Sequence, residues 1–195
     1  MADLNRFLDA HKHGLPQHLG GRPEEPDTFE DALAEIKNGK KKWHWIWYVF
    51  PQIKLGKTDR SKCYSVNSLD EINTRDEAVA FVVAFLAHPV LGQNYREIVA
   101  EVWRQVSEHG NGVKRMFGED FKKFRSSLTL FEWAAQTSGD TALAAQCANI
   151  LEQAATEPGI DDSTRCEATQ AFLIPPMPLR IVIRDAEPKL PFQWI

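Results

Sequence analysis

Along most of the chain, apolar side chains recur every three or four positions, which is the spacing of one face of an α-helix. The clearest stretch runs from Leu91 to Gly110, where the recurring residues are Tyr95, Ile98, Val99, Val102, Trp103 and Val106. Similar stretches cover residues 4–12, 28–38, 74–88, 117–131 and 143–154. Because short connections separate them, the pattern predicts an all-α fold, a compact bundle of about six to eight helices.

Two of these stretches carry a helix start signal. Thr28 with Asp31, and Thr74 with Glu77, have the spacing of a capping box, in which the hydroxyl accepts a backbone N–H while the acid lies at the positive end of the helix. The second of these helices should end before Pro89, because proline interrupts a helix.

Glycine and proline between residues 14 and 27 indicate a linker after a short first helix. A weak helix is predicted over residues 163–172, and the Pro-rich residues after it should be extended, with LRIVIR as either a strand or a tail laid across the body. The predicted division is an N-terminal helix and linker (1–27), a helical core domain (28–157), and a terminal helix with an extended tail (158–195).

The segment WHWIWYVFPQ, residues 43–52, is aromatic and apolar almost throughout. It is too short for periodicity to separate a buried helix from a buried strand. Its aromatic and β-branched content favours a strand, whereas its helical neighbours favour a helix. Pro51 marks its end.

Composition places the chain among folded proteins outside the membrane. Of its 195 residues, 43% are apolar, which is enough for a sizeable core. The longest apolar run, from Val79 to Ala87, is about half of the roughly 20 residues that cross a bilayer, and the N-terminus lacks the apolar region of a signal peptide. We therefore expect no membrane partner and a cytoplasmic location, or a nucleocytoplasmic one in a eukaryote.

Charge is distributed unevenly along the chain. The net charge of -4 argues against binding of duplex nucleic acid, because proteins that track phosphates are usually basic. Eight basic residues and one acidic residue lie between Lys37 and Lys62, which gives +7 in that segment and −11 elsewhere. One segment is therefore strongly electropositive on an acidic body.

Familiar catalytic and metal-binding motifs are absent from the sequence. It contains no G-x-S-x-G, no P-loop, no H-E-x-x-H, no EF-hand loop and no dinucleotide fingerprint. The three cysteines, Cys63, Cys147 and Cys166, lie far apart and indicate neither a disulfide framework nor a zinc site. Three histidines, His11, His13 and His18, lack an accompanying acid or cysteine constellation. We predict no metal site and no cofactor.

The most plausible ligand site lies in residues 43–64. Three tryptophans within five residues supply flat stacking surfaces, and lysines nearby attract phosphate or carboxylate. The candidate ligand-binding residues here are His44, Trp47, Gln52, Lys54 and Tyr64. The alternative is that the tryptophans form core and the lysines are a solvated rim.

Further candidates are polar residues beside apolar ones. His44 is either a general acid or base or a packed histidine bonded to the backbone. Arg125 precedes Ser126 and Ser127, so this group either holds an oxyanion or combines a surface arginine with small packing residues. His88 is expected to complement the end of a helix.

The acids at Glu119-Asp120 fall at a predicted helix beginning, where capping explains them.

Several blocks of the sequence, taken together, resemble a known family. They are FEDALAEIKNGKKKWHWIWYVFPQ, LGKTDRSKCYSV, LAHPVLG and MFGEDFKKFRSSLTLF, in that order. The chain resembles the domain-of-unknown-function family numbered eighteen-ten over residues 28–155. The resemblance implies an orthogonal helical bundle and favours a helix over residues 43–50, but it implies no activity and no catalytic residues. The label calpastatin, which some members carry, gains no support, because calpastatin is disordered and this chain has the aromatic stripes of a packed domain.

The leading functional hypothesis is a site for an anionic, aromatic small molecule such as a nucleotide derivative, formed by the five residues of segment 43–64 together with Arg125. Whether it catalyses a reaction is left open. The rival hypothesis is a protein-interaction module that uses the basic aromatic surface and the C-terminal tail. Single-stranded nucleic acid is a third candidate, which the acidic remainder of the chain disfavours.

Overall fold

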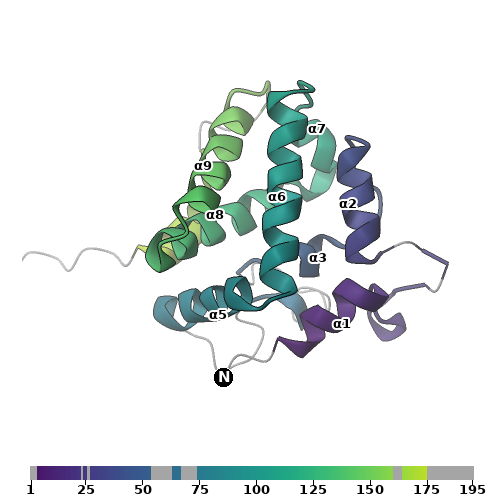
Figure 1. Ribbon diagram of the computed structural model, residues 1–195. Coiled ribbons are helices and arrows are strands. Elements are labelled where there is room, and N and C mark those ends of the chain that lie inside the picture. Colours follow the sequence, from purple (N-terminus) through teal and green to yellow (C-terminus); the bar gives the residue numbers. More distant parts are fainter. Residues whose placement is uncertain are drawn as a thin grey trace, which may run out of the picture.

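The helix α6 (Leu91–Ser107) stands at the centre of the fold in the computed structural model, and the other helices pack around it (Figure 1). The structure describes residues 4–22, 24–25, 27–53, 63–66, 74–159 and 164–174. The longer helices around α6 are α1 (Asn5–His13), α2 (Phe29–Lys37), α5 (Arg75–Ala87), α8 (Phe121–Ser138) and α9 (Thr141–Ala155). The short ones are α3 (Ile46–Val49), α7 (Val113–Phe117) and α10 (Glu167–Leu173), with 3-10 turns η1 (Gln17–Leu19) and η2 (Gly118–Asp120).

The arrangement is an orthogonal bundle, as the family resemblance implied. α5 lies across the foot of α6, and the two helices meet at an angle of 88° (Figure 1). α8 and α9 pack against each other, and α2 and α9 both pack against α6. The described residues form helices and turns without a strand, which confirms the all-α prediction for that part of the chain.

Both predicted helix starts are confirmed. The Asp31 amide donates to Thr28 Oγ1 at 3.3 Å while the Thr28 amide donates to Asp31 Oδ2 at 3.0 Å. Thr74 and Glu77 make the same reciprocal pair at the start of α5. Each box satisfies two amides that the helix itself leaves unpaired.

The sharp corner between α5 and α6 is built by the sequence HPVLG. His88 Nδ1 accepts hydrogen bonds from the amides of Val90 (3.2 Å) and Leu91 (3.3 Å), so this imidazole caps the start of α6. His88 is also the C-cap residue of α5, which confirms that it is a helix-end residue, and its amide donates to the carbonyls of Ala84 (3.1 Å) and Phe85 (3.2 Å). At Gly92 the backbone passes so close to Leu86 that an added Cβ would lie 2.0 Å from the Leu86 carbonyl oxygen.

The long helix predicted over residues 117–131 is interrupted at its beginning. α7 ends at Phe117, Gly118 adopts a left-handed φ of 55°, and η2 precedes α8. The apolar spacing continues through this break because Phe117 and Phe124 stack in the core, with their ring centroids 3.8 Å apart. Periodicity therefore could not reveal it.

Aromatic rings fill the core, and the segment 43–52 supplies its middle. Phe50 is fully buried and meets Tyr95, Phe117 and Phe124, with ring centroids 5.5, 5.9 and 4.8 Å from its own. The fully buried Phe7 of α1 joins the same core cluster. The division into 1–27, 28–157 and 158–195 stays a prediction, and the predicted tail after residue 174 lies outside the described residues.

His11 is a core histidine. Its Nε2 lies 3.0 Å from the Tyr48 carbonyl oxygen and its Nδ1 lies 3.0 Å from Asn94 Nδ2, so the neutral ring with its hydrogen on Nε2 satisfies both contacts. The ring stacks on Phe29 at an interplanar angle of 5°. Both nitrogens are thus engaged in packing, which removes His11 from the set of histidines considered for a metal.

We expect His11 to make stability fall in mild acid. Burial lowers the pKa of His11 from 6.5 to about 4, and His88 acts in the same direction, although the bond with Tyr48 opposes it. Below about pH 6.5 the unfolded chain binds a proton at His11 that the folded chain does not. The free energy of unfolding should therefore fall by about 3 kcal/mol between this pH and about pH 4. Denaturant unfolding at several pH values in this window should show the loss. His11→Gln should make the free energy of unfolding depend less steeply on pH, while the exposed control His13→Gln should leave that slope unchanged. Equal slopes in the two variants would contradict this account.

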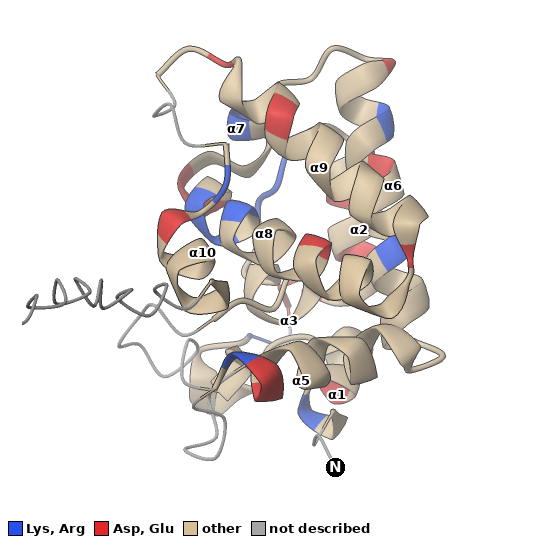
Figure 2. Cartoon of the chain, turned by 90° about the vertical axis from the view of Figure 1, so that its left-hand side faces the viewer, with Lys and Arg blue, Asp and Glu red and all other residues tan. Residues whose placement is uncertain are grey.

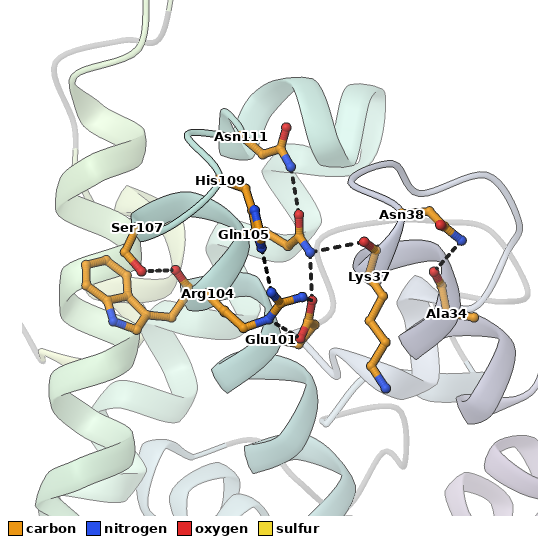
Figure 3. A network of polar contacts seen from close by, with 10 residues as sticks. Ala34, Lys37, Asn38, Glu101, Arg104, Gln105, Ser107, His109 and Asn111 are labelled. Carbon is orange, nitrogen blue, oxygen red and sulfur yellow. Dashed lines mark hydrogen bonds and ion pairs between the residues drawn. The ribbon is translucent and has the colours of Figure 1, made fainter.

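A polar network closes the other end of α6 (Figure 3). Arg104 donates two hydrogen bonds to Glu101, at 2.9 and 2.7 Å, and Gln105 Nε2 donates to Glu101 and to the carbonyl of Lys37. Hydrogen bonds from Arg104 hold the pKa of Glu101 below its ordinary value, against the effect of burial. Since each group has a partner within the network and α2 is tied to α6 through it, we assign it a structural role.

Candidate functional site

The chain between α2 and α3 is held by a buried carboxylate. Glu35 Oε2 accepts hydrogen bonds from the Lys42 amide (2.6 Å), the Trp43 amide (3.3 Å) and the Trp45 indole N–H (2.8 Å). Glu35 is 8% exposed, and its Oε1 is buried without a partner in the described structure. One acid on α2 therefore fixes both the course of this segment and the orientation of its central tryptophan.

Asp27, just before α2, holds the next residue. Its Oδ1 accepts from the His44 amide at 2.7 Å, and its carbonyl accepts from the Tyr48 hydroxyl at 2.5 Å. Burial raises the pKa of Asp27, although the His44 amide opposes the shift. The predicted linker over residues 14–27 thus ends in a buried residue that orders the aromatic segment.

A cavity of about 400 Å³ opens between this segment and the beginning of α8. Its lining comes from the α2–α3 connection, α3, α7, η2 and α8, and consists of Lys41, Lys42, His44, Ile46, Trp47, Phe117, Glu119, Asp120 and Lys123. Basic positions gather near α7 and α8 in Figure 2. The cavity therefore joins a tryptophan to several amines contributed by distant parts of the sequence.

Asp120 links the two sides of this cavity. Lys41 Nζ lies 2.7 Å from Asp120 Oδ2, and Lys123 Nζ contacts the other carboxylate oxygen. Burial raises the pKa of Asp120, but the hydrogen bonds from Lys123 and Lys41 outweigh it and hold the pKa below its ordinary value. Asp120 does occupy the N-cap position of α8, as predicted, but its side chain makes no capping bond there and pairs with the two amines instead.

Both lysines also lie against tryptophan rings. Lys41 Nζ is 4.8 Å from the ring centroid of Trp45, which is fully buried, and Lys123 Nζ is 4.7 Å from that of Trp47, which is half-buried. Such cation–π contacts hold an ammonium group over the negatively charged face of an aromatic ring. The wall of the cavity is thus an indole ring with an amine already placed over it.

The structure brings together some of the predicted site residues and separates others. His44 and Trp47 line the cavity, and the His44 side chain is exposed rather than packed. Gln52 and Tyr64 are buried at 5% and 2% exposure and do not line it. Lys54 lies outside the described residues.

Arg125, Ser126 and Ser127 are buried residues of α8. Arg125 is 9% exposed, and its guanidinium lies 5.6 Å from the Phe121 ring centroid. The alternative that Arg125 is a surface arginine is therefore wrong. Ser126 Oγ bonds with Thr169 Oγ1 at 2.9 Å, and Ser127 Oγ lies 3.4 Å from the Tyr95 hydroxyl. The hydroxyls serve packing between helices.

Sequence reasoning missed Lys123 and Asp120 as cavity residues. They lie about 80 positions after the aromatic segment, and their only local signal is the acid–lysine spacing of three residues on the beginning of a helix. That spacing is common on helix surfaces. What places Asp120 and Lys123 at the cavity is the contact between Asp120 and Lys41, which is a tertiary contact.

The remaining reactive groups show no assembled centre among the described residues. Cys63, Cys147 and Cys166 are unpaired, and burial raises the pKa of the Cys147 thiol. No group of three metal-ligating side chains occurs in the described ranges. In the same ranges, no single helix combines the length and hydropathy of a membrane span, and α5 and α6 meet that criterion only as a bent pair.

Fold and cavity together define an orthogonal all-α protein whose signature sequence blocks build a corner, a core and a basic cavity rim. The chain belongs to the family described as "Protein of unknown function (DUF1810)", whose model matches residues 1–156. Among solved structures it is similar to the conserved hypothetical protein Rv1873 from Mycobacterium tuberculosis, with 25% identity and a TM-score of 0.61 over 88% of this chain and 96% of that one. No curated protein matches the chain.

Proposed function

We propose that the cavity beside α3 binds a small anionic molecule that carries a planar ring, such as a nucleotide derivative. The observation that supports this most is the Lys123 amine placed over the Trp47 ring, with both residues lining the cavity. A flat ring can stack on or beside the indole while its anionic group meets the amines. The ligand class is the one that the sequence suggested, with Lys41, Lys42 and Lys123 in place of Lys54.

The charges of the cavity favour an anion. Lys42 is exposed and its amine has no partner in the described structure, whereas Lys41 and Lys123 share the single carboxylate of Asp120. An incoming phosphate can therefore draw on Lys42 and on the unused donors of Lys123 without first removing a complete ion pair. Glu119 is exposed at the rim, where solvent screens its repulsion.

His44 is the residue to which we assign any proton transfer in this cavity. Its backbone is fixed by Asp27, while its imidazole is exposed and lines the cavity. An imidazole exchanges protons near neutral pH, so it can act as acid or base toward a bound molecule. Binding is the primary proposal, and turnover would rest on this side chain.

A protein-interaction role has less support from the described surface. Val90 and Ile174 are the large hydrophobic side chains exposed in the described ranges, and they belong to different elements. A contiguous apolar patch, which marks many interaction surfaces, is therefore not provided by these residues. The predicted tail that this role needs lies outside the described residues.

The test is a thermal-shift screen against nucleotides, nucleotide sugars and phosphorylated metabolites. A ligand at 100 times its dissociation constant adds about 2.7 kcal/mol of stability, which a melting curve resolves. Lys123→Ala and Trp47→Ala should each weaken a hit about tenfold, the size expected for a lost charged or stacking contact. Lys122→Ala is the matched control, because Lys122 is exposed and lies outside the cavity lining. No hit, or equal weakening by Lys122→Ala and Lys123→Ala, would overturn the proposal.

A further inference from the structure

A second, smaller cavity lies between α8 and α10, away from the site described above. Its volume is about 270 Å³, and its lining includes Glu132, Trp133, Gln136, Arg165, Gln170 and Leu173. This is below the roughly 300–1,000 Å³ of pockets for drug-sized ligands. It therefore suits a molecule smaller than a drug-sized ligand.

The polar wall of this cavity carries one positive and one negative group in contact. Arg165 Nε and Nη2 donate to the Glu132 carboxylate at 2.7 and 2.5 Å. The Glu132 side chain is 7% exposed and that of Arg165 is 29% exposed, so the pair is largely shielded from water. Charges in such a setting interact more strongly with a bound ligand than they would on an open surface.

Uncharged polar groups flank the pair. Gln170 and Trp133 line the cavity, and their side chains make no hydrogen bond within the described structure. Gln136 is held only by a long contact of 3.5 Å to Glu132. The indole ring of Trp133 and the side chain of Leu173 supply an apolar wall.

We propose that this cavity binds a free α-amino acid as its zwitterion. The ligand's carboxylate lies toward Arg165 and its ammonium group toward Glu132. Each charge of the ligand thus faces a protein group of opposite charge, and the Arg165–Glu132 pair stays in contact. The unpartnered donors of Gln170 and Trp133 add hydrogen bonds to the carboxylate. An apolar side chain of the size of leucine then packs against Trp133 and Leu173.

The test uses the full chain with L-leucine and two analogues that each lack one charge. Leucinamide has no carboxylate and 4-methylpentanoate has no ammonium group. By calorimetric titration we expect L-leucine or a similar apolar amino acid to bind, and both analogues to bind at least about tenfold more weakly, because each loses a hydrogen-bonded charge. No binding of any standard amino acid at millimolar concentration, or equal binding of the analogues, would overturn the proposal.

Variants locate the binding. Trp133→Ala and Gln170→Ala change partly exposed side chains, and each should weaken leucine binding about tenfold. Because Trp133 also packs against the core, a melting curve checks that its variant folds, and Gln170→Ala tests the site without that contact. Lys123→Ala should leave it unchanged, since Lys123 lines the other cavity. Loss of leucine binding in Lys123→Ala, with none in Trp133→Ala, would place the ligand elsewhere and refute this site. The anion proposal is tested separately and survives either result.

Discussion

Gly92→Ala should destabilise the protein by about 4 kcal/mol or more, which is at the extreme of single-substitution effects. An added Cβ would lie 2.0 Å from the Leu86 carbonyl oxygen and 2.7 Å from its carbon, and both are backbone atoms that no side-chain rotation can move. Arg96 donates to the carbonyls of Leu86 and Gly92 at 3.0 and 2.9 Å, which fastens the two sides of the corner further. The helices α5 and α6 would have to separate.

The matched control for Gly92→Ala is Gln93→Ala on the same turn of α6. Gln93 is exposed, and alanine has the higher helix propensity, so its stability should change by less than about 0.5 kcal/mol. Chemical denaturation measures both. A loss below about 1 kcal/mol for Gly92→Ala would show that the corner can relax, and the close approach would then not be what requires glycine.

Removing the Glu35 carboxylate should cost about 4 kcal/mol in Glu35→Ala. Three donors lose their acceptor, and the Trp45 indole N–H is fully buried, where an unsatisfied donor costs about 1–3 kcal/mol. The Lys42 amide, at 2.6 Å, loses a bond to a charged acceptor, which is stronger than a neutral one. Truncation also leaves a cavity beside the core.

Two further variants distinguish the loss of these hydrogen bonds from a general destabilisation of α2. Glu35→Gln keeps one acceptor oxygen and should lose about half as much, while Glu30→Ala, exposed on the same helix, should lose less than about 0.5 kcal/mol. Melting curves with a ligand of the α3 cavity give a second readout, since a displaced segment 40–47 moves Lys42, His44 and Trp47 together. Similar losses for Glu30→Ala and Glu35→Ala would refute the anchoring role.

Most of the helices could be predicted from the sequence because helix formation depends on local chemistry. The capping boxes at Thr28 and Thr74 act within four residues, and the apolar stripe of α6 is long enough for its period to be unambiguous. The segment 43–52 was ambiguous because it forms only one helical turn, α3, and is buried by tertiary contacts on several sides. The break at Gly118 leaves no mark on the periodicity because Phe117 and Phe124, on either side of it, reach the same core.

The candidate site was only partly readable. Trp47 and His44 were identified because aromatic and basic residues are adjacent in the sequence, but the same argument selected Gln52 and Tyr64, which the core buries. Composition of a segment does not say which of its faces is exposed. The amines that complete the cavity depend on the Lys41–Asp120 contact between segments 79 positions apart, which no local pattern encodes.

The attachment of α10 to α8 combines polar contacts with one apolar anchor, Leu173. The family match ends at residue 156, before α10, and the described contacts that hold α10 to α8 include hydrogen bonds and an ion pair of Ser126, Thr129 and Glu132. Hydroxyl and carboxylate groups of this kind are readily hydrated when uncovered. Loss of α10 would therefore uncover polar groups of α8 that water can satisfy, but it would also empty the place that Leu173 fills in the apolar core.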